Sequence, residues 1–189
     1  MKKINFLLIA LSIIIVACKN EKKDTKIIET ESVEIEAKKP KKLTIALNAK
    51  SESNATGNVV FKEEDGKVTM TALLSGLEPG EHAIHIHESS DCSSPDGKST
   101  GGHWNPTNTA HGKWGADEGY HKGDIGNFTA DENGNATKTF STDEWCIGCG
   151  DETKDIVGKG VIVHAGTDDF TSQPTGAAGG RVSCGGIIE

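Results

Sequence analysis

Short runs in which apolar and polar residues alternate recur along the chain from Leu43 onward. Alternation with a period of two residues is typical of a strand that buries one face. The runs lie at residues 43–47, 58–61, 67–73, 81–88, 125–130, 136–141, 156–164 and 181–188. Glu64-Asp65-Gly66 and Asn133-Gly134 supply turn signals between two pairs of runs. Eight strands without a helix of useful length predict an all-β fold, an antiparallel barrel or sandwich.

Two long polar intervals interrupt this pattern, at residues 89–123 and 165–180. Structureless connections of that length are uncommon in compact domains and usually carry function. These two intervals contain or flank most of the seven histidines of the chain. We therefore expect the chemistry of the protein to lie in or beside the two loops.

The composition agrees with a globular β domain that is rich in glycine. Hydrophobic residues make up 34% of the 189 residues, aromatic residues 5%, and glycine occupies 23 positions. Outside residues 1–17, no apolar run has the length of a membrane span. This excludes a multipass membrane protein, a coiled coil and most helical bundles, which would not tolerate so much glycine.

The first residues have the pattern of a targeting segment rather than of a folded element. A positive start, Met1-Lys2-Lys3, precedes a short and mostly apolar stretch. Ile15-Val16-Ala17-Cys18 then resembles a bacterial lipobox, in which the cysteine is lipidated and becomes the new N-terminus. A plain secretory signal with a chance cysteine is the alternative. In either case we expect residues 1–17 to be a signal peptide and the chain to be exported to the periplasm or cell envelope.

Charge divides the rest of the chain into two parts. Residues 18–42 hold eight lysines against six acidic residues and show little periodicity, which predicts a disordered tether behind a lipid-anchored Cys18. Residues 43–189 form the predicted domain, with 10 basic and 22 acidic residues and a net charge of −12. A domain that acidic is a poor candidate for binding nucleic acid.

Two histidines share one face of the strand predicted at residues 81–88. In His85-Ile86-His87 a period of two places both imidazoles on one face and the isoleucine on the other. Two neutral imidazoles on one face can chelate a metal ion, although such pairs also occur as solvent-facing strand residues. His164, at the end of another apolar strand, could join this face. An all-nitrogen set suits copper, which heads the order of metal affinities.

A second candidate metal set lies in the first polar interval. It comprises His103, His111, His121 and Asp124. Three imidazoles and a carboxylate suit a tetrahedral Zn²⁺ site without an open position. Such a site is structural and would order a loop that lacks a core of its own. The alternative is a polar loop in which histidines accumulate by chance.

Four separated segments together resemble copper/zinc superoxide dismutase. They are His85-Ile86-His87, Gly102-His103-Trp104-Asn105-Pro106, His121-Lys122-Gly123-Asp124-Ile125-Gly126-Asn127 and Gly179-Gly180-Arg181-Val182-Ser183-Cys184-Gly185. The resemblance runs in order over residues 43–188, and no metal ligand of the family pattern is missing. It implies an eight-stranded antiparallel Greek-key barrel with two long functional loops.

The resemblance also implies roles for individual residues. The family pattern makes His85, His87, His103 and His164 copper ligands and makes His103, His111, His121 and Asp124 zinc ligands. His103 would then bridge the two metals. Asp168 matches an aspartate that links a copper-ligand histidine to a zinc-ligand histidine. His82 matches a histidine that bonds the backbone, and Cys92 and Cys184 match the intrachain disulfide.

The activity implied by the resemblance is the dismutation of superoxide to O₂ and H₂O₂. Zinc has no redox chemistry, so copper must change oxidation state. In the family mechanism His103 leaves the reduced copper, takes up a proton and returns it. Arg181 matches the arginine that docks the anion, and a surface ion pair is its alternative role. A metal-buffering module of the same fold is the rival function. A zinc hydrolase would need an open zinc position, which this ligand set does not leave. Family members from bacteria occur as monomers and as dimers, so a homodimer is compatible with this chain.

Two features depart from the family pattern. The stretch from Asp168 to Gly180 contains no lysine, whereas relatives often carry lysines there that attract the anion. Lys113 or Lys122 are candidates to compensate for this loss. Cys146-Ile147-Gly148-Cys149 lies outside the matched motifs. For an exported protein we expect a local disulfide between Cys146 and Cys149, with capture of copper or zinc by the thiols as the alternative.

Overall fold

The computed structural model describes residues 40–189, and the predictions for residues 1–39, the signal peptide, Cys18 and most of the tether, lie outside the described residues. Eight strands and one short 3₁₀ helix make up the regular structure of the described part. They are β1 (Lys41–Ala49), β2 (Thr56–Glu64), β3 (Lys67–Ser75), β4 (Gly80–His87), η1 (Lys98–Thr100), β5 (Gly126–Ala130), β6 (Ala136–Thr142), β7 (Gly160–His164) and β8 (Arg181–Gly186). Within the described residues, no helix has the length and apolar character needed to cross a membrane.

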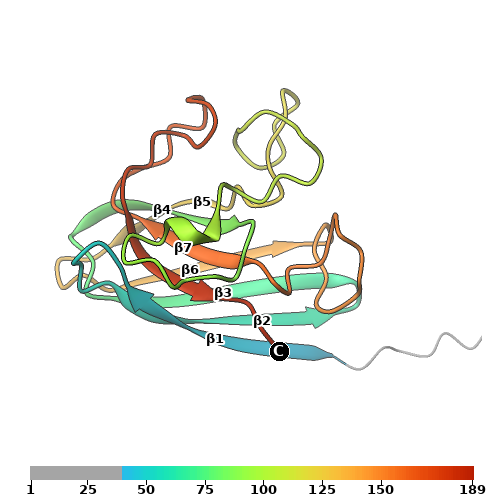
Figure 1. Cartoon of the computed structure of the whole chain (residues 1–189), viewed down its shortest axis with the longest axis horizontal. Coiled ribbons are helices and arrows are strands. Elements are labelled where there is room, and N and C mark those ends of the chain that lie inside the picture. Colours follow the sequence, from blue (N-terminus) through green and yellow to red (C-terminus); the bar gives the residue numbers. More distant parts are fainter. Residues whose placement is uncertain (1–39) are drawn as a thin grey trace, which may run out of the picture. The chain divides into compact units, whose positions relative to one another are not determined.

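All eight strands belong to one antiparallel sheet, in the order β5-β4-β7-β8-β1-β2-β3-β6. The sheet curls into a nearly closed barrel (Figure 1). The connections from β3 to β4 and from β6 to β7 join strands that are not neighbours in the sheet. The prediction of an all-β, eight-stranded antiparallel barrel is confirmed.

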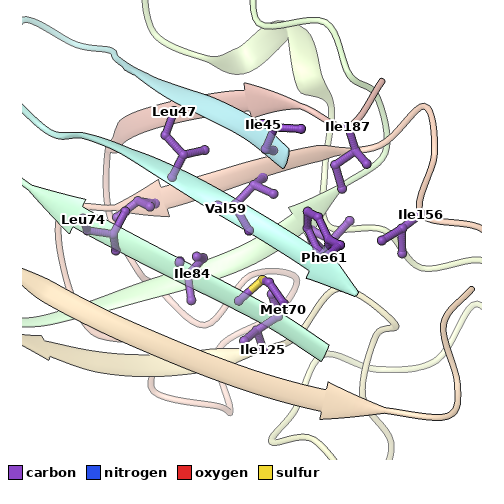
Figure 2. Packing of buried hydrophobic residues seen from close by; sticks show 14 of the residues in the cluster. Ile45, Leu47, Val59, Phe61, Met70, Leu74, Ile84, Ile125, Ile156 and Ile187 are labelled. Carbon is purple, nitrogen blue, oxygen red and sulfur yellow. The ribbon is translucent and has the colours of Figure 1, made fainter. Parts of the chain in front are cut away.

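Alternating side chains from the strands fill the interior of the barrel. On β3, for example, Val68, Met70, Ala72 and Leu74 are buried and the residues between them are more exposed. Figure 2 shows Val59, Phe61 and Met70 from neighbouring strands pointing into the same interior. Each strand therefore buries every second side chain in the barrel interior, as the period-two pattern of the sequence predicts.

All eight strands lie where the sequence predicts them, but their bounds differ from the prediction by one to four residues at one end or both, and β1 and β7 show why. β1 begins at Lys41 rather than Leu43, because Lys41 and Lys42 pair with Glu63 and Lys62 of β2. β7 begins at Gly160 rather than at Ile156. Ile156 is buried in the core, but the turn that contains Gly158 with a positive φ of 85° separates it from the strand.

Two long loops are the parts of the fold that matter for the site. One joins β4 to β5 and the other joins β7 to β8, and both rise from one side of the barrel above β4 and β7 (Figure 1). The loops contact each other and the barrel through hydrogen bonds, including Ala83 N to Gly166 O at 2.8 Å. They cover the outer face of β4, which is opposite the hydrophobic interior.

Candidate metal centre

Six buried histidines and one buried aspartate form two groups that share one residue. The first group is His85, His87, His103 and His164, and the second is His103, His111, His121 and Asp124. Within each group, one potential ligand atom per residue lies within 4.8 Å of the others. All seven side chains belong to residues that are at most 4% exposed. The structure thus brings together the two sets that the sequence predicts.

Strand β4 and its neighbours position the first group. Ile84 and Ile86 pack into the core, so the strand period sends His85 and His87 to the outer face, as expected. A bridge between the backbones of His87 and His103 brings the long loop beside the strand. Trp104 N donates to Ile86 O at 2.9 Å, which fixes the same approach.

Each histidine of the first group is held through one ring nitrogen. Nδ1 of His87 lies 3.0 Å from Gly101 O, and Nδ1 of His164 lies 3.3 Å from Gly179 O. Nε2 of His85 lies 2.9 Å from Oδ2 of Asp168, and Nδ1 of His103 lies 2.8 Å from Oδ1 of Asp124. These contacts set the orientation of each ring and leave the second ring nitrogen to face the interior of the group.

The nitrogens that face the two groups have no hydrogen-bond partner. They are Nδ1 of His85, Nε2 of His87, Nε2 of His103, Nδ1 of His111, Nδ1 of His121 and Nε2 of His164. A buried polar atom without a partner is costly, and metal coordination is a way to satisfy it. The four unpartnered nitrogens of the first group fit copper. The two of the second group fit zinc together with Nδ1 of His103 and the carboxylate of Asp124, which contact each other.

The second group shows the same convergence around Asp124. Its carboxylate oxygens lie 3.0 Å from Nδ1 of His111 and 3.3 Å from Nδ1 of His121. Neither nitrogen forms a hydrogen bond, so these atoms share a neighbourhood without bonding to each other. Asp124 also accepts the backbone N–H of His121 at 2.8 Å and that of Gly112 at 3.2 Å. The carboxylate therefore organises the loop as well as completing the ligand set.

The carboxylate of Asp168 contacts one histidine of each group. Oδ2 lies 2.9 Å from Nε2 of His85, and Oδ1 lies 2.9 Å from Nε2 of His111. Asn127 fixes the backbone of Asp168, because its Oδ1 accepts the N–H and its Nδ2 donates to the carbonyl, each at 2.9 Å. The aspartate is 1% exposed and therefore shielded from water.

The protein groups around the site favour neutral imidazoles in the first group. Burial, reinforced by the neighbouring imidazole of His85, lowers the pKa of His164 to about 3. For His103, burial outweighs the hydrogen bond to Asp124 and lowers the pKa to about 4. At His111 burial acts in the same direction, but the nearby carboxylates of Asp124 and Asp168 outweigh it and raise the pKa to about 9. Neutral imidazole is the form that binds metal.

Arg181 stands at the start of β8, beside the first group. Its Nη1 donates to Gly97 O at 2.8 Å and to Oγ1 of Thr100 at 3.0 Å. Its Nη2 donates to Gly101 O at 2.8 Å, and that carbonyl is also the partner of His87. Its hydrogen bonds run to two carbonyls and a hydroxyl, and within the described residues this guanidinium forms no ion pair.

The cysteines of the domain form two pairs. Cys92 is bonded to Cys184, as the resemblance implies, and Cys146 is bonded to Cys149. Asp155 lies close to the second pair. Its oxygens accept the backbone N–H groups of residues 148, 150 and 157 at 2.8–3.0 Å. Protein groups therefore satisfy this carboxylate, which favours a closed turn over the alternative of metal capture.

The remaining histidine lies outside both groups, as expected. Nδ1 of His82 lies 2.9 Å from His164 O, and Nε2 lies 2.8 Å from Glu78 O. Three further side chains, which the sequence pattern does not mark as functional, hold site residues in place: Thr100 contacts Arg181, Asn127 contacts Asp168 and Gln173 contacts His111. Asn127 belongs to the segment at residues 121–127 that carries the resemblance, whereas Thr100 and Gln173 lie in loops without a local pattern.

Comparison with known proteins agrees with this geometry. The model of the family described as copper/zinc superoxide dismutase (SODC) matches residues 55–187. A SOD-like protein from Bacillus subtilis has a crystal structure with a TM-score of 0.68 and 28% identity, covering 77% of this chain and 97% of that one. A double mutant of that protein gives a TM-score of 0.69 and 30% identity over the same shares. The clock protein EA4 gives a TM-score of 0.67 and 35% identity, covering 79% of this chain and 96% of the other. With its two metal-type clusters and a match over most of its length, this chain belongs to the copper/zinc superoxide dismutase family.

Proposed function

We propose that this protein is a superoxide dismutase that converts two superoxide ions and two protons into O₂ and H₂O₂. The observation that carries the proposal is the set of six unpaired, buried imidazole nitrogens beside an anchored arginine. His85, His87, His103 and His164 would hold copper, and His103, His111, His121 and Asp124 would hold zinc. When bound, copper supplies a one-electron redox change, and zinc adds positive charge without redox chemistry.

The protein groups have separate tasks in this reaction. The guanidinium of Arg181 is held rigidly by three hydrogen bonds, so it can attract and orient a small anion at little further entropic cost. Nε2 of His103 is the atom that can take up a proton and release it to the product. Its Nδ1 lies beside Asp124 in the second group and is the atom that zinc would hold, so the ring would keep its orientation as Nε2 gains and loses the proton.

The test is the metal content and dismutation rate of the full chain, with His164→Ala as the diagnostic variant. His164 suits this test better than His85, because its second nitrogen contacts only Gly179 O whereas that of His85 contacts Asp168. We expect about one copper and one zinc per chain, with rapid dismutation. The variant should lose dismutation and keep its zinc.

The same experiment separates the enzyme from a metal-buffering protein. Full occupancy by both metals without dismutation would favour buffering. Dismutation that survives in His164→Ala would overturn the copper assignment. The anchored guanidinium of Arg181 favours an enzyme over a metal-buffering protein, because storing metal does not require a fixed cation beside the site.

We further propose that the protein acts outside the cytoplasm, attached to a membrane by lipid on Cys18. The lipobox-like sequence Ile15-Val16-Ala17-Cys18 supports this proposal, as do disulfides that persist in oxidising compartments. Fractionation of cells that express the wild-type chain or Cys18→Ser tests it. We expect the wild-type chain in the membrane fraction and the variant outside it, and equal distributions would contradict the anchor.

A further inference from the structure

The side chain of Gln173, in the loop between β7 and β8, contacts His111, a candidate zinc ligand in the loop between β4 and β5. Its Oε1 accepts the backbone N–H of His111 at 2.9 Å, and its Nε2 donates to the backbone carbonyl of His111 at 2.9 Å. One side-chain amide thus pairs with both polar groups of one residue. The two residues are 62 positions apart in sequence.

His111 needs this support because it lies outside every strand. Within a sheet the neighbouring strand would satisfy its backbone N–H and carbonyl, but the loop at this point supplies no such ladder. In the ring of His111, Nε2 faces Asp168 and Nδ1 faces Asp124. Hydrogen bonds to both the backbone N–H and the carbonyl of His111 therefore keep its ring oriented toward both aspartates.

A compact turn places Gln173 where it can reach His111. Oδ1 of Asp169 accepts the backbone N–H groups of Thr171 and Ser172 at 2.9 and 2.8 Å. Ser172 O accepts the N–H of Gly176 at 2.7 Å, and Gly176 O accepts the N–H of Asp169 at 2.9 Å. The turn from 169 to 176 is therefore closed by its own hydrogen bonds.

The closed turn lies directly against the bond between Asp168 and His111. Gly176 has a positive φ of 69°, and a Cβ built on it would overlap Oδ1 of Asp168 and lie 2.6 Å from Nε2 of His111. Only glycine fits there without displacing the pair. The turn thus contacts His111 at its ring through Gly176 and at its backbone through Gln173.

We propose that Gln173 is a positioning residue for the zinc site, which couples zinc binding to the order of the loop leading to Arg181. The inference rests on the zinc site proposed above. When zinc fixes His111, the amide pair holds the 169–176 turn. When the turn is held, His111 is preorganised for zinc. Because coupling between two such events is reciprocal, loss of the amide pair must weaken both.

The test uses the full chain without copper and compares Gln173→Met with Thr171→Ala. Methionine keeps the approximate length of glutamine without its hydrogen-bonding groups. Thr171 lies in the same exposed turn, and within the described residues its side chain forms no hydrogen bond with His111 or with another candidate metal ligand, so it is the matched control. Zinc affinity is measured by competition with a chelator. Binding of Co²⁺ alone, followed by its visible spectrum, reports the geometry of the same ligand set.

We expect Gln173→Met to bind zinc about tenfold more weakly than wild type and to alter the Co²⁺ spectrum, because partners that orient metal ligands have effects of this size. In the metal-free protein, the backbone amide of His111 should exchange its hydrogen faster in the variant. Thr171→Ala should match wild type in all three measurements. Equal zinc affinity, spectrum and exchange in a folded Gln173→Met protein would overturn the proposal.

An error in the zinc assignment itself would give a different result in the wild-type protein. A wild-type chain that takes up neither Zn²⁺ nor Co²⁺ would overturn the zinc assignment and, with it, this inference. If Gln173→Met does not fold, Gln173→Ala combined with the hydrogen-exchange measurement provides the same comparison.

Discussion

Oδ1 of Asp168 lies 2.9 Å from Nε2 of His111, while Oδ2 of the same carboxylate lies at the same distance from Nε2 of His85. One residue therefore orients a ligand in each of the two metal-type groups. Burial alone would raise the pKa of Asp168, but the hydrogen bonds from His111 and His85 outweigh it and lower that pKa. The carboxylate thus stays ionised and accepts from both rings.

Replacing Asp168 with asparagine should weaken zinc binding by about 10- to 100-fold. An amide can accept from one imidazole N–H, but its NH₂ group then faces the other. Competition with a chelator measures the effect. Asp131→Asn is the control, because in the described part of the chain that carboxylate bonds only to the backbone N–H groups of Asn133 and Asn135 in the turn between β5 and β6. Equal zinc affinity in Asp168→Asn and wild type would contradict a positioning role.

Arg181→Ala should lower kcat/KM for dismutation by roughly 10- to 100-fold, the size expected for losing a charged hydrogen-bond donor. Copper and zinc contents should not change, because Arg181 holds carbonyls and a hydroxyl rather than ligand atoms. The kcat/KM of Arg181→Lys should lie between those of wild type and Arg181→Ala, since lysine keeps the charge but lacks the planar guanidinium group. A kcat/KM for Arg181→Ala equal to that of wild type would show that the anion docks elsewhere.

Two lysines near the site, Lys98 and Lys122, are each paired with an acidic residue. Lys98 lies in η1, within the loop that holds Arg181, but its Nζ pairs with Asp96 at 2.9 Å. Lys122, a candidate to replace the missing loop lysines, is paired with Glu144. Each pair is neutral overall, and the domain that contains them is acidic.

We therefore expect kcat/KM to change by less than about twofold between about 0.01 and 0.15 M salt. Asp96→Asn should release the charge of Lys98, raise kcat/KM a few-fold at low salt and introduce a salt dependence. Stopped-flow measurements across this range check both statements. A steep decline with salt in the wild-type protein would mean that other cations steer the anion.

The sequence reveals the parts of this structure that depend on local pattern. Period-two alternation predicts the strands because each strand buries one face, and His85 and His87 follow the same rule. Ile156 shows the limit of that rule, since an apolar residue in a buried turn looks like the start of a strand. The contacts of Thr100 with Arg181 and of Gln173 with His111 span 81 and 62 positions. No local pattern encodes them, because they exist only once the loops have come together.

The two disulfides should contribute very differently to stability. Cys92 and Cys184 are separated by 92 positions, whereas Cys146 and Cys149 are separated by 3. If cross-linking acts mainly on the entropy of the unfolded chain, the long bridge is worth about 4 to 5 kcal/mol and the short one less than about 2 kcal/mol. The long bridge also anchors the loop that continues to Gly97, Thr100 and Gly101, the partners of Arg181.

Denaturant unfolding of the Cys92→Ser/Cys184→Ser and Cys146→Ser/Cys149→Ser double variants tests this difference. The first should lose about 2 to 5 kcal/mol in the free energy of unfolding, together with a part of kcat/KM, because Arg181 is less well held. The second should lose far less stability and keep its activity, since Asp155 still binds the backbone of the turn. Equal destabilisation of the two proteins would mean that chain entropy is not the dominant contribution of either bridge.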